Sequence, residues 1–391
     1  MKIVSINYQP ILNDRCGNAL IQKIFDSFKG LNPDKALFLT SSIDKDYGEC
    51  IKGLNWSCYF IVRVFRKFCK ILKIPYYYQR TIEEHIVDRY TAAALARIAK
   101  PYILLTSMYS PISCKLAKRK GNKVILVAGN LNDNLYYNAI KAEKKRLGLT
   151  YTDVYDSDFR LDYYNRTLLH IDEVWCNSAL CIESFRGTHK TKLVPTTFYT
   201  FKESQKKVYS ETVQETIIFG YIGHTVLLKG IHQFAEAISK SKYKKKIKLE
   251  IAGSIAPEIK KIISKFNINV QYLGRISNEE KKKFMLDIDA LVVPSLFDCG
   301  PTTIFEGLET STPLIVSDGC GAAEFLTDGK NCVLFEHSNL ENLTNKINYF
   351  CENYKEITKR AIETNSETIE SIIRKNPNDA FTKAITELTF E

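Results

Sequence analysis

Short apolar, β-branched runs alternate with longer helical stretches along almost the whole chain. In the first half the strand candidates are residues 3–7, 36–40, 102–107, 123–128, 173–177 and 192–195, and in the second half they are residues 216–222, 248–252, 269–272, 290–294, 313–317 and 332–335. Helical patterns separate most of these runs, for example at residues 230–240, 257–266, 278–286 and 302–310. This alternation predicts an α/β fold with parallel sheets that carry helices on both faces.

The length of the chain favours two domains. At 391 residues it exceeds what one hydrophobic core organises, so two domains of roughly 180–200 residues are expected. The strand candidates form two tandem sets, and the polar stretch 201–215 is the predicted boundary between them. We therefore expect a Rossmann-like domain at residues 1–200, a second one at residues 201–365, and a helical tail at residues 366–391 that can return to the first domain.

Cysteine usage and hydropathy bear on the compartment. The eleven cysteines include no C-x-x-C pair, so neither a zinc site nor a disulfide framework is expected. Thiols within apolar runs are typical of a reducing compartment. Residues 1–6 have the pattern of a strand rather than a signal peptide, and no apolar run approaches the ~20 residues that span a bilayer. We therefore expect a cytoplasmic protein.

The most informative segment is residues 294–306, with the sequence PSLFDCGPTTIFE. A buried strand ends at its start, and Gly300 precedes a predicted helix with Pro301 at its first position, where a missing N–H is tolerated. The free N–H groups of Thr302 and Thr303 would then face a ligand. A helix N-terminus of this kind is a ready site for phosphate or hydroxyl groups.

This segment resembles the retaining family-4 glycosyltransferases (glycosyl transferases group 1), whose signature is two acids separated by seven residues. Here Asp298 and Glu306 have that spacing, and STPLIVSD at residues 311–318 and GCGAAE at residues 319–324 follow them. The first acid is Asp where the family usually has Glu. The resemblance implies a GT-B fold, in which two Rossmann-like domains face each other across a cleft. It implies that Glu306 holds the ribose of a nucleoside diphosphate sugar and that Asp298 holds the donor sugar.

The loop at residues 219–230 resembles the family's Gly-Arg…Lys-Gly loop, in which two cations hold the donor diphosphate. Lys229 matches in place and spacing, and with Asp298 and Glu306 it completes the predicted catalytic set. His224 stands where the family usually has Arg, and a free histidine is mostly uncharged at neutral pH.

The resemblance also implies weaker donor-binding candidates. Gly274 and Arg275 lie in a loop that borders the nucleotide base in the family, and Arg15 and Gly17 lie in a loop that the family places opposite the donor phosphates. Many relatives carry a histidine after the fourth or fifth strand of the first domain, and here the corresponding run ends in Ala-Gly-Asn at residues 128–130.

Two D-x-D patterns, at residues 156–158 and 287–289, match the divalent-cation motif of GT-A transferases. Both are short and frequent by chance, and the phosphate charge here can be met by Lys229 and a helix dipole. We predict no metal and no cofactor other than the donor substrate.

The formal net charge is +11, and part of the excess lies in a predicted helix at residues 56–74. Its five basic residues fall on one helical face, and aromatic and aliphatic residues cover the rest: Arg63, Arg66, Lys67, Lys70 and Lys73. This pattern is typical of a helix that lies on anionic lipid. A helix packed on its own domain with a basic solvent face, or one lining the cleft, fits equally well. No nucleic-acid partner is expected, because no recognised module accompanies the basic patches.

The sequence thus predicts transfer of a sugar from a UDP- or GDP-linked donor to a sugar or lipid-linked acceptor, with retention of configuration, in cell-surface polysaccharide or glycoconjugate assembly. The first domain would bind the acceptor. If the acceptor is lipid-linked, the protein would work at the inner face of the cell membrane. Two alternatives stay open. A GT-B epimerase would use the same cleft but needs an acid/base pair near the sugar, and a non-catalytic nucleotide-sugar-binding or scaffold subunit is favoured by His224, Asp298 and the missing histidine.

Overall fold

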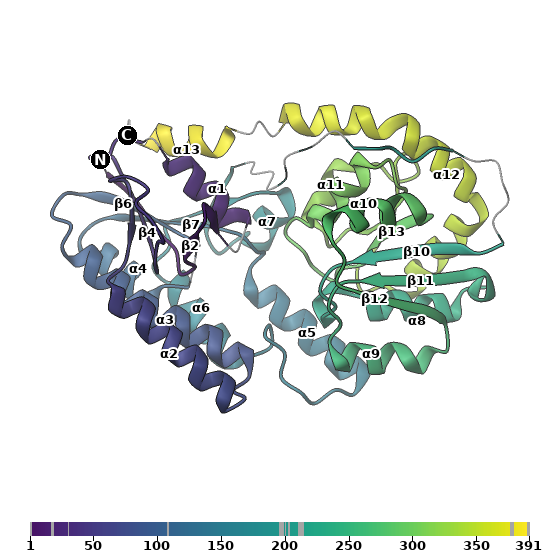
Figure 1. Cartoon of the computed structure of the whole chain (residues 1–391), viewed down its shortest axis with the longest axis horizontal. Helices are drawn as coiled ribbons and strands as arrows, with labels where there is room; N and C mark the ends of the chain where they lie inside the picture. The colour runs from purple at the N-terminus through teal and green to yellow at the C-terminus, as the bar shows by residue number, and fades with distance from the viewer. Residues whose placement is uncertain are drawn as a thin grey trace. The chain divides into compact units, whose positions relative to one another are not determined.

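The computed structural model describes residues 2–16, 19–29, 31–107, 109–194, 199, 201, 204–209, 215–375 and 379–388. The chain divides into two compact units, one formed by Met1–Phe198 with Pro377–Glu391 and the other by Tyr199–Asn376. Each unit is built around one parallel sheet with helices on both faces (Figure 1).

The first unit contains a seven-stranded sheet in the order β5-β4-β1-β6-β7-β8-β9. Its strands are β1 (Lys2–Ile6), β4 (Ala36–Thr40), β5 (Ile51–Gly53), β6 (Tyr102–Thr106), β7 (Lys123–Val127), β8 (Glu173–Cys176) and β9 (Lys190–Leu193). From β1 the chain first adds β4 and β5 on one side and then adds β6 to β9 on the other. The winding direction therefore reverses between β1 and β6.

The helices of this unit are α1 (Ala19–Phe28), α2 (Trp56–Ile71), α3 (Tyr76–Ala96), α4 (Pro111–Arg119), α5 (Asp133–Leu147), α6 (Asp158–Leu168), α7 (Ala179–Ser184) and α13 (Ala380–Leu388). Neighbouring residues of one strand enter different cores. Ile3 packs into a core with α1 and α13, and Val4 packs into another with α4. Since both faces of the strands are buried, the strands are apolar throughout rather than alternating.

The second unit contains a six-stranded sheet in the order β12-β11-β10-β13-β14-β15. Its strands are β10 (Ile217–Ile222), β11 (Ile247–Ala252), β12 (Asn269–Gly274), β13 (Ala290–Val293), β14 (Leu314–Ser317) and β15 (Cys332–Phe335). Its helices are α8 (Ile231–Lys240), α9 (Pro257–Ile263), α10 (Asn278–Asp287), α11 (Thr302–Glu309) and α12 (Leu340–Lys375), with short 3-10 turns η1 (Leu227–Lys229), η2 (Lys244–Lys246), η3 (Ser264–Phe266) and η4 (Gly321–Phe325). Here the winding direction reverses between β10 and β13.

All strand pairings described within the two main sheets are parallel, which confirms the predicted α/β class with two Rossmann-like sheets. Three described strands have no counterpart among the predicted ones: β5, and the two strands β2 (Ile11–Leu12) and β3 (Arg15–Cys16), which form a small antiparallel hairpin. Its turn residues Asn13 and Asp14 both have positive φ, a conformation that Asn and Asp tolerate better than most residues.

The C-terminal part of the chain is helical and passes from one unit to the other. The helix α12 runs for 36 residues without a break at residue 366, because no proline or glycine interrupts it before residue 375. The last helix, α13, packs against α1 of the first unit (Figure 1). Phe381 contacts Trp175 edge to face, with ring centroids 5.9 Å apart. Within the described ranges, every helix is too short or too polar to cross a bilayer.

Candidate functional site

The candidate donor site lies where the sheet of the second unit reverses its winding. The loops that follow β10 and β13 start from adjacent strands on either side of this reversal. In parallel α/β sheets such a reversal leaves a crevice at the carboxyl ends of the strands, where ligands bind. A hydrogen bond from Leu296 N–H to Leu228 O, 2.9 Å long, joins the two loops. Residues 223–230 and 294–300, which the sequence singled out separately, therefore meet at one edge of the sheet.

Two glycines allow close approaches between loops at this edge, Gly230 between the loops after β10 and β13 and Gly253 between the loops after β11 and β10. Gly230 has a φ of 66°, and a Cβ there would lie 1.7 Å from the carbonyl oxygen of Pro294. Gly253 has a φ of 120°, and a Cβ there would lie 2.0 Å from the carbonyl oxygen of Gly223. Neither position accepts a side chain without a shift of the neighbouring loop.

Lys229 and Asp298 form an ion pair between the two loops, through Nζ and Oδ2, with side chains 36% and 13% exposed. The backbone fixes the carboxylate, because Asp298 N–H donates to Gly319 O and Gly321 N–H donates to Asp298 O. The other carboxylate oxygen, Oδ1, accepts a bond of 3.3 Å from Gly300 N–H. The structure thus brings together two of the three predicted catalytic residues.

The third, Glu306, lies in the middle of α11 and is paired with a residue that the motifs did not indicate. Lys281 of α10 places its Nζ 2.6 Å from Glu306 Oε1. Both side chains are partly buried, so the pair is shielded from solvent more than a surface pair would be. No local pattern marks Lys281, because its relation to Glu306 depends on how α10 packs beside α11.

The start of α11 differs slightly from the prediction. Pro301 is the N-cap residue rather than the first helical residue, and it supplies no side-chain cap. Ile304 N–H bonds back to Pro301 O, whereas the described residues provide no acceptor for the N–H groups of Thr302 and Thr303. The two amides therefore remain available at the positive end of the helix dipole.

His224 follows β10 and is exposed. Its Nδ1 lies 2.6 Å from Ser254 Oγ, and its backbone carbonyl accepts a bond of 3.1 Å from the hydroxyl of Tyr221. Burial raises the pKa of Tyr221, so this hydroxyl stays protonated and donates. Ser254 and Tyr221 were not predicted, and they orient His224 by contacts that no sequence motif encodes.

The remaining candidates are scattered. Gly274 ends β12, and both it and Arg275 are exposed. The carbonyl of Gly274 accepts from Gly253 N–H at 2.6 Å, which ties this loop to the one after β11. Arg15 is exposed on the β2–β3 hairpin of the first unit. Gly17 lies outside the described residues.

Three of the four D-x-D aspartates are held by different partners. Asp156 pairs with Lys144, and Asp158 accepts from the hydroxyl of Tyr137. Asp289 Oδ2 accepts a bond of 2.8 Å from Ile218 N–H, and burial raises the pKa of this carboxyl group. In the part of the chain that the structure describes, no three His, Cys, Asp or Glu side chains are grouped so as to hold a metal.

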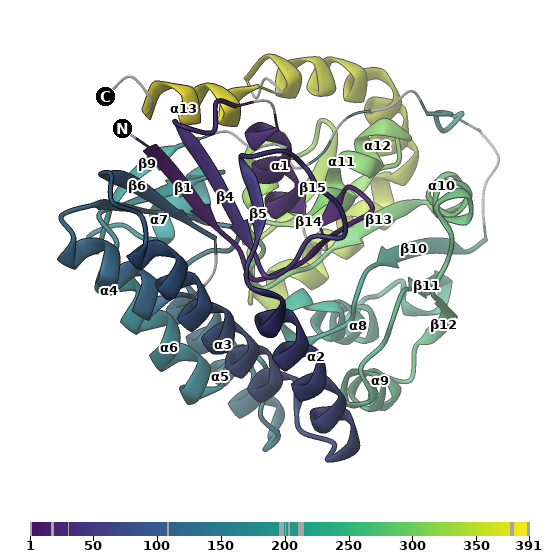
Figure 2. The ribbon, with the colours of Figure 1, turned by 60° about the vertical axis from the view of Figure 1, so that its left-hand side comes forward.

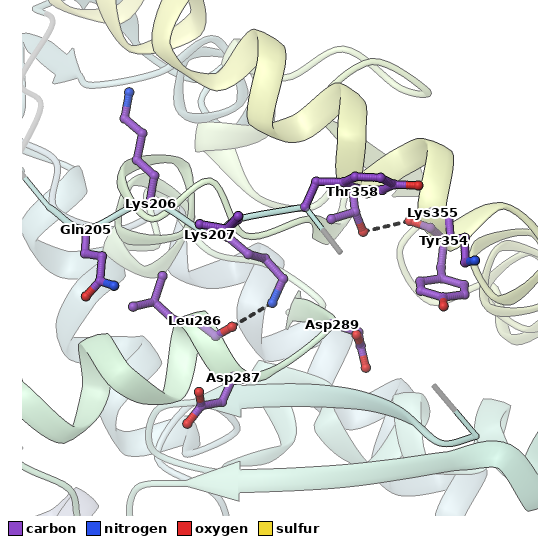
Figure 3. A pocket seen from close by; sticks show the side chains of 11 residues that line it. Gln205, Lys206, Lys207, Leu286, Asp287, Asp289, Tyr354, Lys355 and Thr358 are labelled. Atoms are coloured by element: carbon purple, nitrogen blue, oxygen red, sulfur yellow. Dashed lines mark hydrogen bonds between the residues drawn. The ribbon is translucent and has the colours of Figure 1, made fainter. Parts of the chain in front are cut away.

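Asp287 and Asp289 line a cavity of about 350 Å³ at the other end of the sheet (Figure 3). There the ammonium group of Lys207 donates to the carbonyls of Leu286 and Ile288, at 2.7 Å each. Burial lowers the pKa of Lys207. Since Asp289 directly precedes β13, this cavity lies at the amino ends of the strands, away from the crevice that holds Lys229.

Comparison with known proteins gives a family match within the second unit. Residues 202–368 match the family model described as Glycosyl transferases group 1. An uncharacterized glycosyltransferase of Methanocaldococcus jannaschii is 31% identical over 128 residues, which cover 32% of this chain and 36% of that protein. The match thus spans about a third of the relative's length.

The fold of the whole chain also has close counterparts. Sucrose-phosphate synthase from Thermosynechococcus elongatus has a TM-score of 0.63 at 14% identity, covering 99% of this chain and 98% of that one. Anabaena HepE in complex with UDP and glucose has a TM-score of 0.60 at 14% identity, covering 99% of each chain. The lipopolysaccharide outer core galactosyltransferase WaaB has a TM-score of 0.59 at 14% identity, covering 98% of this chain and all of that one. Residues 202–368 therefore match the model of the glycosyl transferases group 1 family, and the chain has the GT-B fold.

Proposed function

We propose that this chain is a nucleotide-sugar-dependent glycosyltransferase that moves a sugar to an acceptor hydroxyl with retention of configuration. The observation that carries the proposal is the meeting of Lys229, Asp298 and the start of α11 at the winding reversal of the second unit. A cation beside unpaired amides at a helix N-terminus fits a diphosphate group. This arrangement lies within the segment that matches the transferase family.

In the proposed reaction the acceptor oxygen forms a bond to the anomeric carbon while the bond from that carbon to the diphosphate oxygen breaks. The bonding electrons leave with the nucleoside diphosphate, and the acceptor proton passes to a departing phosphate oxygen. Lys229 and the amides of Thr302 and Thr303 stabilise the charge that develops on the leaving group. Asp298 holds the sugar and its developing positive charge, and Glu306 accepts hydrogen bonds from the ribose. No enzymic nucleophile is needed.

We propose UDP as the nucleotide of the donor. HepE is described in complex with UDP and glucose, and a further structure of similar fold, at 11% identity, is described as bound with UDP-2-fluoro glucose. Both have the fold of this chain over 99% or more of its length. A GDP-linked donor is the alternative, and a nucleotide panel separates the two.

A thermal-shift panel tests the donor site. With UDP at 100 times its dissociation constant, a stabilisation of about 2.7 kcal/mol corresponds to roughly 5–10 °C for a unit of this size. Glu306→Ala removes hydrogen bonds to a charged group that are worth about 1.5–3 kcal/mol, so UDP should bind about 10–100-fold more weakly. Glu279→Ala, which removes an exposed carboxylate from the first turn of α10, is the matched control.

The competing proposal is a non-catalytic nucleotide-sugar binder. It is favoured by one observation, the exposed His224 in place of arginine. Such a binder would give the UDP-dependent shift without any release of UDP from UDP-sugars. If wild type releases UDP and Asp298→Asn does not, the chain is not a non-catalytic binder. If no nucleotide shifts the melting temperature, both proposals are contradicted.

We also propose that α2 holds the enzyme at an anionic membrane surface, in the assembly of a cell-surface polysaccharide or glycoconjugate, with a lipid-linked acceptor at the inner face of the cell membrane. One face of α2 (Cys58, Val62 and Cys69) is buried, and the helix packs against α3 (Figure 2). A second face and the helix ends carry large exposed apolar side chains: Trp56, Tyr59, Phe60, Ile61, Val64, Phe68, Ile71 and Leu72. Trp56 and Ile71 are 75% and 78% exposed.

The basic residues of α2 occupy its third face. At 100° per residue, Arg63, Lys67 and Lys70 lie between the buried stripe and the exposed apolar stripe, and all three are exposed. A helix packed on its own domain needs no second apolar face, whereas a helix that lies in a lipid interface needs apolar and basic faces side by side. This three-sided arrangement supports the membrane-facing version of the sequence prediction.

A further inference from the structure

The helices α10 and α11 bring two charged side chains together beside the start of α11. In a parallel sheet the helices that follow the strands begin at the carboxyl ends of those strands, and α10 and α11 follow β12 and β13. Lys281 and Glu306 each lie about one turn inside the start of their helix. Phe284 of α10 and Phe305 of α11 belong to the same hydrophobic core, which holds the two helices together.

Lys281 holds one oxygen of the Glu306 carboxylate. Its Nζ donates to Oε1 at 2.6 Å, and the side chains of Lys281 and Glu306 are 26% and 16% exposed. The backbone of Lys281 is itself fixed, because its N–H donates to Ser277 O at 2.9 Å in the first turn of α10, which a capping box closes. A glutamate side chain has several rotatable bonds, so a held oxygen selects one orientation of the carboxylate.

The second oxygen of Glu306 is open to a ligand. Oε2 has no hydrogen-bond partner among the described residues, and it is not one of the unpartnered atoms that are buried. A carboxylate oxygen only accepts hydrogen bonds, so the group that would complete this site is a donor.

The place of Glu306 along α11 indicates which part of a nucleotide supplies this donor. Glu306 lies one turn after Thr302 and Thr303, whose amides bind the diphosphate in the proposed reaction. The ribose of a nucleoside diphosphate is bonded to the nearer phosphate, and its hydroxyl groups are neutral donors. The pair with Lys281 also offsets the charge of Glu306, which would otherwise repel the diphosphate.

We infer that Lys281 is a positioning residue for the nucleotide: it orients Glu306 so that Oε2 accepts a hydrogen bond from the ribose, and it thereby makes the site prefer ribonucleotides to deoxyribonucleotides. The inference rests on the proposed function, in which Glu306 binds the ribose. It adds a residue that lies outside the matched motifs and a specificity that this residue controls.

The test is isothermal titration calorimetry on the full chain with UDP, 2′-deoxy-UDP and 3′-deoxy-UDP, and with the corresponding guanosine nucleotides. Wild type should bind the ribonucleotide about 10–100-fold more tightly than at least one of its deoxy analogues, as for loss of a hydrogen bond to a charged group. Lys281→Met leaves the carboxylate unheld and should lower this preference about tenfold. Lys281→Arg keeps a charged donor beside Glu306 and should retain the preference.

Two further variants control for charge and for folding. Lys283→Met removes an exposed lysine from another face of α10 and should leave the preference unchanged. The double variant Lys281→Met, Glu306→Gln should show the same preference as Glu306→Gln alone, because Lys281 acts through Glu306. Since the double variant leaves no unpaired charge at this position, it covers the case in which Lys281→Met does not fold.

The outcomes separate this inference from the proposed function. Equal weakening of the ribonucleotide and both deoxy analogues in Lys281→Met would mean that Lys281 acts through net charge rather than position, and it would overturn the inference. The same holds for equal loss of preference in Lys281→Arg and Lys281→Met, for a further loss in the double variant, and for a wild type that binds all three nucleotides equally. Each of these results leaves the donor site standing. If wild type binds none of the nucleotides, the proposed function is contradicted and the inference with it.

Discussion

Replacing Lys229 by methionine should slow turnover far more than it destabilises the fold. The Lys229 side chain is 36% exposed, so its pair with Asp298 contributes at most about 1 kcal/mol to stability after solvent screening. Asp298 keeps the bond of 3.3 Å from Gly300 N–H in the variant and is not left without a donor. Against the charge of a departing diphosphate, one positioned donor is worth roughly 3–4 kcal/mol, which is about 10²–10³ in kcat.

The assay is release of UDP at saturating donor, with the melting temperature measured on the same preparation. Lys261→Met is the control, because it removes an exposed lysine from α9 without touching the crevice. A fall in kcat of less than about tenfold for Lys229→Met would refute the assignment of Lys229 to the leaving group. An equal fall for Lys261→Met would mean that net charge, rather than position, matters.

Two further predictions concern the surface and the pH dependence. The double variant Phe60→Ser, Phe68→Ser should no longer float with vesicles that contain anionic lipid, because burying each aromatic side chain in the bilayer contributes about 1.5–3 kcal/mol to binding. Ile373→Ser, which changes an exposed apolar residue on α12, should leave flotation unchanged. Flotation of the double variant would refute the membrane role of α2. Burial alone would raise the pKa of Asp318, but hydrogen bonds from the His337 side chain and backbone outweigh it and lower the pKa. The stability that Asp318 contributes is therefore fully present above its unfolded pKa of about 3.9 and is lost as the pH falls through its lower folded-state pKa. Urea unfolding should give a difference in unfolding free energy between wild type and Asp318→Asn that narrows as the pH falls below about 4, and a constant difference would contradict the assignment.

The fold class was predictable because it rests on local pattern. Strands that are buried on both faces have continuous apolar sequences, and the helical stretches between most of them favour parallel crossover connections. The contact of Lys229 with Asp298 was within reach of the same reasoning, because each follows a strand and the two strands, β10 and β13, flank a winding reversal. The donor roles of these residues stay predictions.

The residues that sequence reasoning missed depend on packing between distant elements. Lys281 meets Glu306 only because α10 and α11 lie together, and neither spacing nor composition marks it. Glu84 lies in a helix without a motif. Its place beside the residues that follow β1, β6 and β7, where it pairs with Arg80, depends on how α3 packs in the first unit. Even in α2, the sequence distinguished a basic face from an apolar one, but which apolar residues would be covered by α3 was a tertiary fact.

The two units share one architectural feature, a winding reversal in the sheet, but the charges near the two reversals differ. Each sheet reverses its winding once, and each reversal leaves a crevice at the carboxyl ends of two adjacent strands. In the second unit the crevice presents Lys229 and unpaired helix amides, which suit an anion. In the first unit both arginines are paired with carboxylates, and the buried polar atoms without a hydrogen-bond partner among the described residues include Glu84 Oε2, Arg160 Nε and the hydroxyl of Tyr164. The transfer that we propose would use this difference, because an anionic nucleotide sugar is attracted to the positive charge at the second reversal and not to the balanced charges at the first.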